Sequence, residues 1–276
     1  MTEHQGQDLG ASPVDLELDR AHSARMYDYY LGGTTNFTAD REAVGRVLAA
    51  FPGVRVAART NREFMHRATR WAAEHGLRQF LDIGTGIPTS PNLHEVVQLS
   101  VPAARVVYAD NDPIVLAHAQ ALLRSTPQGR TAYVEADAKE PETLLKASAL
   151  RDTLDLSRPV ALSLNALLHF VTDADGAYAI IERYKEALAP GSTLALSHAT
   201  PDFDAETMNR MIDIYTAAGT PLQFRTKEEF SRFFDGWELV EPGVTVSHRW
   251  RPDDPRESGQ VSDADAACYV AVARKP

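Results

Sequence analysis

The sequence predicts an α/β protein: a Rossmann-like, doubly wound, mostly parallel sheet with an N-terminal helical extension and a C-terminal antiparallel hairpin. Two observations predict this fold class. Between residues 79 and 199, apolar runs of strand length alternate with helical segments, as in parallel sheets covered by helices. Near the C-terminus, two strand-like segments follow one another with only a polar loop between them. We expect a flexible N-terminus at 1–20, a helical lid or extension at 21–76 and the Rossmann-like domain at 77–276.

The residues before the first predicted strand have a helical pattern. The segment "SARMYDYYLGG" (23–33) predicts a short, aromatic-rich helix that ends at Gly32 and Gly33. A second helix ends at Gly76, a typical C-cap residue. Its segment "NREFMHRATRWAAEHG" (61–76) places apolar residues on one face: Phe64, Ala68, Trp71 and Ala72.

The alternating region then supplies the parallel sheet. Its predicted strands are nearly continuous apolar runs, as expected for strands buried on both faces. They lie at 79–84, 105–110, 131–136, 159–164 and 192–199. The helices between them are expected at roughly 89–100, 113–124, 141–149 and 173–189. Two helix starts are well marked, by Asp112 before Pro113 and by a capping box at 226–229.

The C-terminal segments "WELVEPGVTV" (237–246) and "ACYVAVARK" (267–275) both have strand patterns. The polar loop 249–266 between them is too short for a covering helix, so these strands should pair in an antiparallel hairpin.

Composition excludes several classes of function. Lys and Arg total 28 against 38 Asp and Glu, and a formal charge of −10 gives no general attraction to nucleic acids or anionic membranes. No stretch approaches the roughly 20 apolar residues of a membrane span. The single cysteine, Cys268, excludes an intrachain disulfide and a thiolate zinc cage, and the histidines have no ligand spacing, so we expect no metal. We expect a cytoplasmic protein without a signal peptide, and no feature indicates its oligomeric state.

The loop after the first strand, in "FLDIGTGIPTSPNLHEV" (80–96), carries the first functional signal. Glycine at positions 84 and 86 allows a tight turn and a close approach of backbone amides to a ligand. Two glycines alone are a weak signal, because a plain strand-to-helix turn also uses them. The following strand ends decide between these interpretations.

Polar residues stand at the ends of the next three strands. Asp110 ends the second strand, 24 residues after Gly86, where a carboxylate accepts hydrogen bonds from ribose hydroxyls. Asp137 follows the third strand, where an adenine amino group would find an acceptor, and Asn165 and His169 follow the fourth. Ligands of open α/β sheets bind beyond the carboxyl ends of strands, so these positions predict one crevice.

The loop chemistry favours one of two cofactors that use such a crevice. Dinucleotide folds usually keep a third glycine, which lets a pyrophosphate rest on the helix N-terminus. Here Pro88 follows instead and restricts the residue before it. S-adenosylmethionine has no phosphate and needs only the close approach at the glycines, so we expect it rather than NAD.

The order "FLDIGTG", "YADND", "EADA", "LNALLHF", "LAPGSTLALS" and a closing antiparallel pair resembles class I S-adenosylmethionine-dependent methyltransferases over 79–276. With "ARMYDYYLGGTTNFTADREA" at the N-terminus, the chain more narrowly resembles an actinobacterial family, formerly a domain of unknown function and later labelled S-adenosyl methyltransferase. The resemblance implies a Rossmann-like sheet with S-adenosyl-L-methionine at Gly84 to Gly86, Asp110 and Asp137. Thr85, Asn111 and Ala138 adjoin these positions and complete the cofactor candidates there. The replacement of the third glycine by Pro88 appears as a trait of that family.

The N-terminal helix provides candidates for a lid. Tyr27 and Tyr30 fall on one helix face, and the polar loop that follows is costly to place in a core and natural over a ligand. We therefore expect Arg25, Tyr30 and Asn36 to close on the cofactor and to hold its carboxylate.

Methyl transfer can be catalysed largely by alignment, and a base is needed only when the nucleophile must lose a proton. His169 is the candidate catalytic residue, and His198 is the second candidate; a packed or orienting histidine is an equally valid interpretation of each. The leading hypothesis is a methyltransferase acting on a small-molecule acceptor. The alternatives are a regulatory protein that binds S-adenosylmethionine or S-adenosylhomocysteine without turnover, and an NAD(P)-dependent oxidoreductase.

Overall fold

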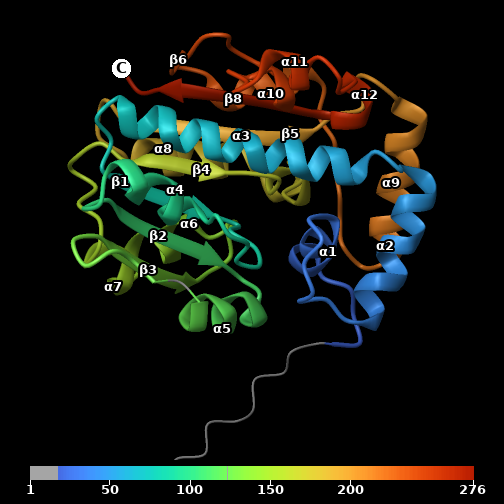
Figure 1. Cartoon of the computed structure of the whole chain (residues 1–276), viewed down its shortest axis with the longest axis horizontal. Helices are drawn as coiled ribbons and strands as arrows, with labels where there is room; N and C mark the ends of the chain where they lie inside the picture. Colours follow the sequence, from blue (N-terminus) through green and yellow to red (C-terminus); the bar gives the residue numbers. More distant parts are fainter. Residues whose placement is uncertain (1–17, 123) are drawn as a thin grey trace, which may run out of the picture.

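A computed structural model describes residues 18–122 and 124–276 and confirms the predicted fold class (Figure 1). One mixed sheet has the strand order β3-β2-β1-β4-β5-β8-β6, with β7 also paired to β8. The first five strands are parallel, and β8 runs antiparallel to β5, β6 and β7. The strands are β1 Gln79–Ile83, β2 Arg105–Asp110, β3 Arg130–Glu135, β4 Ala161–Leu164, β5 Thr193–Ala199, β6 Glu238–Leu239, β7 Thr245–Val246 and β8 Cys268–Arg274.

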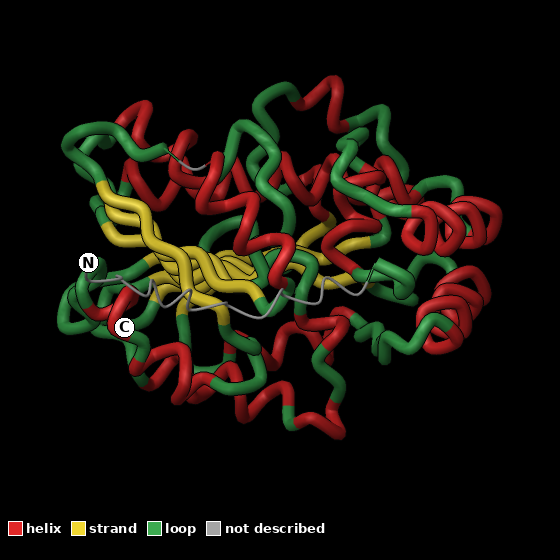
Figure 2. Tube along the Cα trace, turned by 90° about the horizontal axis from the view of Figure 1, so that it is seen from below, coloured by secondary structure: helices red, strands yellow, loops and turns green. Residues whose placement is uncertain are grey.

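Helices cover both faces of this sheet (Figure 2). α3 (Val54–Glu74) and α4 (Leu93–Ser100) pack on one face, and the predicted apolar stripe of α3 is buried there. α5 (Pro113–Leu122) packs against β2 and β3. The opposite face is covered by α6 (Pro141–Lys146), α7 (Ser148–Arg151), α8 (Ala177–Glu186), α10 (Lys227–Ser231) and the 3-10 helix η3 (Arg232–Phe234).

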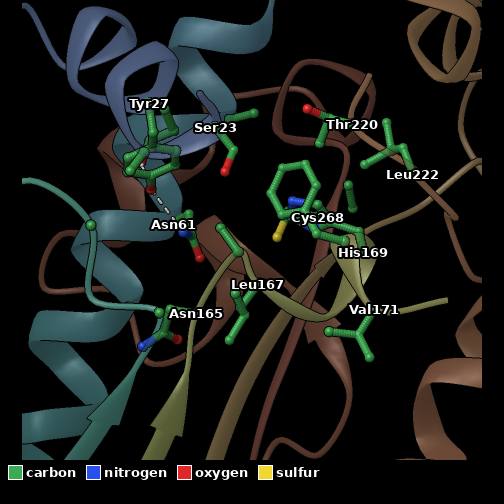
Figure 3. A pocket seen from close by; sticks show the side chains of 18 of the residues that line it. Ser23, Tyr27, Asn61, Asn165, Leu167, His169, Val171, Thr220, Leu222 and Cys268 are labelled. Atoms are coloured by element: carbon green, nitrogen blue, oxygen red, sulfur yellow. Dashed lines mark hydrogen bonds between the residues drawn. The ribbon is translucent and has the colours of Figure 1, made fainter. Parts of the chain in front are cut away.

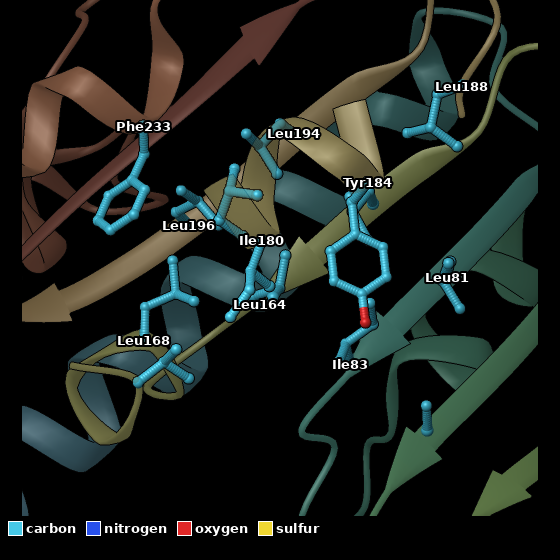
Figure 4. Close-up of a cluster of buried hydrophobic side chains, with 14 of the residues drawn as sticks. Leu81, Ile83, Leu164, Leu168, Ile180, Tyr184, Leu188, Leu194, Leu196 and Phe233 are labelled. Carbon is cyan, nitrogen blue, oxygen red and sulfur yellow. The ribbon is translucent and has the colours of Figure 1, made fainter. Parts of the chain in front are cut away.

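The core on this second face joins strand residues to α8 and η3 (Figure 4). Leu81, Ile83 and Leu164 project from the strands and pack against Ile180 and Tyr184 of α8. Burial on both faces explains why the strands are nearly continuous apolar runs.

A third group of helices lies beside the carboxyl ends of the strands and consists of α1 (Ser23–Tyr30), α2 (Thr38–Ala50) and α9 (Ala205–Ala217) (Figure 1). We call it the helical cap. α9 joins the cap although it follows β5 in sequence, whereas α3 packs on the sheet apart from its first turns, which contact the cap. The division at residue 76 stays a prediction, and the expected flexible segment lies outside the described residues except for 18–20.

Local structure refines two predicted helices. The predicted helix at 89–100 begins at Leu93, because Asn92 and Glu95 form a capping box after a loop with prolines at 88 and 91. The predicted helix at 173–189 is divided at Gly176, whose φ of 81° ends the 3-10 helix η2 (Asp173–Asp175) before α8 begins.

The C-terminal strands pair antiparallel as predicted. The segment before the loop is split into β6 and β7 by a turn at Gly243 (φ 79°). The loop itself contains short helices: η4 Ser247–Arg249, α11 Pro255–Ser258 and α12 Asp263–Ala266. None of the helices in the described part of the chain has the length and apolar character needed to span a bilayer.

Candidate functional site

A cavity of about 370 Å³ lies between the carboxyl ends of β1 to β4 and the helical cap (Figure 3). Its lining includes most of the predicted site residues: Tyr30, Gly84, Thr85, Gly86, Asp110, Asn111, Asp137, Ala138, Asn165 and His169. The structure does not bring Arg25 or Asn36 into this lining. Within residues 18–122 and 124–276, no group of three or more His, Cys, Asp or Glu side chains is placed to hold a metal ion.

The glycine loop after β1 needs both of its glycines, for different reasons. Gly84 and Gly86 have φ values of 71° and 66°, in the left-handed region that favours glycine. A Cβ atom on Gly84 would also lie 2.7 Å from both Cδ atoms of Leu167, whereas one on Gly86 would meet nothing within 4 Å. The backbone conformation favours glycine at both positions, and close packing by Leu167 is a second reason for glycine at position 84 only.

Asp110 ties this loop to the end of β2. Its carboxylate accepts hydrogen bonds from the backbone N–H of Gly86 at 2.8 Å and of Asp112 at 3.0 Å. The side chain is buried at the cavity wall, and burial raises the pKa of this carboxyl group, although the two N–H donors oppose the shift. Asp110 thus holds the loop in shape and presents a carboxylate to the cavity.

Asp82 is a lining residue that the sequence analysis missed. Its carboxylate accepts hydrogen bonds from the hydroxyls of Ser163 (2.5 Å) and Thr85 (2.9 Å), and burial raises its pKa. The available signal was an acid inside the otherwise apolar run "FLDIG", since an unpaired carboxylate is costly at a strand position buried on both faces.

Two residues that line the cavity, Asn61 and Asn165, each have a buried amide oxygen without a hydrogen-bond partner among the described residues. Asn61 comes from α3, and its Nδ2 donates to the Tyr27 hydroxyl at 2.8 Å (Figure 3). An unsatisfied buried acceptor costs about 1–3 kcal/mol, so both oxygens suit a polar ligand with N–H or O–H groups.

Arg62, also missed, lies one position further along α3 and lines the cavity. Its guanidinium donates hydrogen bonds to the carbonyls of Thr89 and Pro91 (3.1 Å for the latter), on the loop between β1 and α4. A positive charge is thereby held beside the glycine loop.

The exposed side of the cavity is formed at the end of β3. Asp137 accepts a hydrogen bond from the backbone N–H of Lys139 at 2.9 Å, and both residues line the cavity together with Ala138 and Asn111. Asp137 and Ala138 stand after the end of β3 as predicted, and Asn111 follows the end of β2.

Arg25 and Asn36 make contacts within the N-terminal segment. The Arg25 guanidinium donates to the Arg20 carbonyl at 3.1 Å, and its Nε lies 3.6 Å from Asp40 and 3.8 Å from Asp112. The Asn36 amide donates to Asp28 at 3.0 Å. Their contacts hold α1 in place at the cavity.

The two histidine candidates differ in their hydrogen bonding. His169 lines the cavity, and its buried Nδ1 has no partner among the described residues. Burial, with further contributions from His198 and Arg225, holds the pKa of His169 well below its usual range. His198 lies outside the lining; its Nδ1 is 2.7 Å from the Ala199 carbonyl and its Nε2 is 2.9 Å from an Arg225 nitrogen. Both His198 nitrogens are thus engaged, whereas His169 keeps one for a ligand.

Arg225, which the sequence analysis did not single out, positions the loop that carries His169. It is 1% exposed, and besides His198 its guanidinium binds the carbonyls of Leu168 and Val171, each at 3.0 Å. It also pairs with Asp173 at 2.7 Å.

A parallel sheet with a glycine loop after β1 and carboxylates at the neighbouring strand ends defines a Rossmann-like protein that binds a nucleoside-containing cofactor. The model of the S-adenosyl methyltransferase family matches residues 10–276, nearly the whole chain. The chain belongs to this family and is an S-adenosylmethionine-dependent methyltransferase, with S-adenosyl-L-methionine as its cofactor. No comparison favours the oxidoreductase or the regulatory alternative.

Solved structures agree with this assignment. A DUF574 family protein from Streptomyces avermitilis is 50% identical, with a TM-score of 0.92 over 95% of this chain and 100% of that chain. A candidate methyltransferase from Thermobifida fusca is 37% identical, with a TM-score of 0.87 over 96% of this chain and 98% of that chain. The plantazolicin methyltransferase BpumL, 11% identical with a TM-score of 0.51 over 92% and 95% of the two chains, shares the fold alone. The search of curated proteins gave no match.

Proposed function

We propose that this methyltransferase acts on a small-molecule acceptor in the cytoplasm. The observation that supports the acceptor size is the cavity of about 370 Å³, which lies within the range of small-molecule sites and is placed between the sheet and the helical cap. The acidic net charge argues against nucleic acid as the acceptor. The single cysteine, Cys268, is buried as a free thiol, which suits a reducing compartment.

The strand ends would hold the cofactor. In this proposal Asp110 accepts hydrogen bonds from the ribose, and Asp137 with Asn111 and Ala138 surrounds the adenine. Gly84, Thr85 and Gly86 allow the methionine part to approach the backbone, and the unsatisfied oxygens of Asn61 and Asn165 suit its ammonium group. When bound, S-adenosyl-L-methionine supplies an electrophilic methyl group on a sulfonium sulfur.

Arg62 is our candidate for the residue that holds the cofactor carboxylate. It lines the cavity beside the glycine loop, and its charge attracts a carboxylate there. Arg25 and Asn36, which do not reach the lining, take the role of positioning residues that keep α1 closed over the site. The segment 21–76 would then combine a lid with one sheet-covering helix.

His169 is the proposed catalytic residue. Its lowered pKa keeps the imidazole neutral at physiological pH, and its unpaired Nδ1 can accept the proton of an acceptor hydroxyl. Its neighbours His198 and Arg225 orient it and do not reach the cavity.

Calorimetric titration with S-adenosylmethionine, S-adenosylhomocysteine and NADH tests the cofactor site, and we expect binding of the first two only. Binding of NADH alone would contradict the cofactor assignment. A labelled-methyl assay on fractionated cell extract tests the acceptor. We expect label in the low-molecular-weight fraction; label in protein or nucleic acid would refute the small-molecule proposal.

His169→Gln separates catalysis from binding. We expect it to keep S-adenosylhomocysteine affinity while turnover falls about 100-fold or more, the usual contribution of a general base. Unchanged turnover would remove His169 from the catalytic role.

A further inference from the structure

The part of the cavity away from the strand ends has its own chemistry, and we call it the apolar lobe. It is lined by the helical cap, by the residues before α3 and by the segment 220–224 after α9. Its members are large and apolar or aromatic: Tyr30, Phe51, Met208, Met211, Tyr215 and Phe224. Their side chains, together with Phe170, place aromatic rings and thioethers around this half of the cavity.

The charged side chains of the cavity stand at its other end. They come from α3 and from the ends of β1 to β3, namely Arg62, Asp82, Asp110, Asp137 and Lys139. The lining residues of α9 and of the segment 220–224 include no Asp, Glu, Lys or Arg. A charged acceptor in the apolar lobe would lose its hydration without gaining a counter-charge, which costs several kcal/mol.

The apolar lobe has several aromatic rings in contact with one another, which favours an aromatic ligand. The Phe170 and Tyr215 rings have centroids 5.9 Å apart, and the His169 ring lies 6.3 Å from that of Phe224. Rings at these distances pack directly against each other, and their remaining faces and edges, like methionine sulfur, make favourable contacts with a further aromatic ring. Burial raises the pKa of Tyr215 to about 12, as expected in surroundings of low polarity.

Few polar groups are available to orient a ligand there. The Tyr30 and Tyr215 hydroxyls lie 3.2 Å apart and engage each other. The Thr220 side chain and the His169 ring both border this region (Figure 3). The unpaired His169 Nδ1 marks the position where a ligand proton donor would be satisfied.

We propose that the methyl acceptor is an uncharged aromatic compound that fills the apolar lobe and presents a hydroxyl group to Nδ1 of His169. This inference rests on the proposed function of the site. A hydroxyl suits the position because it must lose a proton as it is methylated, whereas an aliphatic amine would enter as a disfavoured cation.

The reaction at that hydroxyl balances without a further reactant. The acceptor oxygen forms the bond to the methyl carbon, the electron pair of the broken carbon–sulfur bond stays on sulfur, and the hydroxyl proton passes to His169 and then to water. The positive charge lost from sulfur reappears on the imidazole, so the buried site keeps the same net charge. This offsets the cost of protonating a histidine in surroundings that disfavour its charged form.

Binding of matched probes tests the acceptor class directly. We would titrate the full-length protein, with and without saturating S-adenosylhomocysteine, with 1-naphthol, 1-naphthoate and 1-naphthylmethylammonium. We expect 1-naphthol to bind about tenfold or more tighter than either charged analogue, a difference of about 1.4 kcal/mol or more. Equal or tighter binding of a charged analogue would overturn the proposal.

Two substitutions at Thr220, one charged and one uncharged, provide a matched pair of variants. Thr220 lies in a partly exposed segment, and its backbone N–H bonds to the Tyr215 carbonyl at 2.9 Å, a contact that does not depend on the side chain. We expect Thr220→Glu to weaken 1-naphthol binding about tenfold or more and Thr220→Val to keep it within about threefold. Equal affinities in the two folded variants, checked by circular dichroism, would contradict the location of the acceptor.

The cofactor titration tests the cofactor site independently of the acceptor class. If S-adenosylhomocysteine fails to bind, the proposed cofactor site is wrong, and 1-naphthol binding to the ligand-free protein still tests the apolar lobe. If S-adenosylhomocysteine binds but 1-naphthol does not, the cofactor site stands and the acceptor class is refuted.

Discussion

Replacing Asp110 with alanine tests the contact that joins the first two strand ends. The carboxylate accepts two backbone N–H hydrogen bonds, at 2.8 and 3.0 Å, and is 7% exposed. A hydrogen bond to a charged group contributes about 1.5–3 kcal/mol, so losing both bonds can lower the free energy of unfolding by at most about 3–6 kcal/mol. Cavity water can reach the freed N–H groups in the variant, so we expect Asp110→Ala to lower the free energy of unfolding by about 2–4 kcal/mol.

The same substitution should also weaken cofactor binding, because the proposed ribose acceptor is lost. We expect the S-adenosylhomocysteine affinity to fall by about 1–3 kcal/mol. Asp137→Ala is the matched control, since Asp137 also lines the cavity at a strand end but is exposed, and its carboxylate accepts one hydrogen bond among the described residues, from the Lys139 N–H. It should weaken binding while changing the free energy of unfolding by no more than about 0.5 kcal/mol.

Urea unfolding and calorimetric titration of the three proteins separate these effects. If Asp110→Ala unfolds at the wild-type urea concentration, the two hydrogen bonds do not hold the glycine loop. If its S-adenosylhomocysteine affinity is unchanged, Asp110 does not contact the cofactor. A stability loss in Asp137→Ala as large as in Asp110→Ala would refute the distinction between the two strand ends.

Three further predictions concern residues around the site. Gly84→Ala should cost about 1–3 kcal/mol more stability than Gly86→Ala, because both strain a left-handed turn but only the first displaces Leu167; equal urea midpoints would count against this. Arg225→Met should lower the free energy of unfolding by about 3–5 kcal/mol, measured by urea unfolding, because it strips several buried acceptors of their donor; a loss below about 1 kcal/mol would show that water replaces the guanidinium. Burial lowers the pKa of His198 to about 3. The stability that comes from keeping this imidazole neutral in the folded protein is therefore complete above pH 6.5 and is lost as the pH falls toward 3. Between pH 6.5 and 5 the free energy of unfolding of the wild type should fall by about 2 kcal/mol more than that of His198→Gln. Parallel profiles of unfolding free energy against pH would contradict the lowered pKa.

The sheet could be predicted from the sequence because each strand is indicated by a short, continuous sequence pattern. Each of the first five strands is a short apolar run, and the ends of β2, β3 and β4 carry polar residues that line the cavity, namely Asp110, Asp137 and Asn165. Parallel strands place such ends at one edge whatever the details of packing. The fold class and the cofactor end of the site follow from these two facts.

Residues that reach the site from elsewhere could not be predicted in this way. Arg62 and Asn61 lie on a helix that packs across one sheet face, and only that packing brings them to the glycine loop. α9 lies far from α1 in sequence, so no local pattern indicates that Tyr215 meets Tyr30. Arg25 lies in a segment whose composition indicates a lid, but its contacts with Asp40 and Asp112 hold it outside the cavity lining.

The contacts around Asp112 connect the cofactor end of the site to the lid. The Asp112 N–H donates to Asp110, which in turn accepts from Gly86, while the Asp112 carboxylate lies 3.0 Å from His22 and 3.8 Å from Arg25. Burial alone would raise the pKa of Asp112, but the hydrogen bond and charge of His22, with the charge of Arg25, hold it below its usual value. The ionised carboxylate therefore holds the start of α1 against the same loop that shapes the proposed ribose site. Because α1 also carries Tyr30 into the apolar lobe, this one loop joins the proposed cofactor and acceptor halves of the cavity through direct contacts.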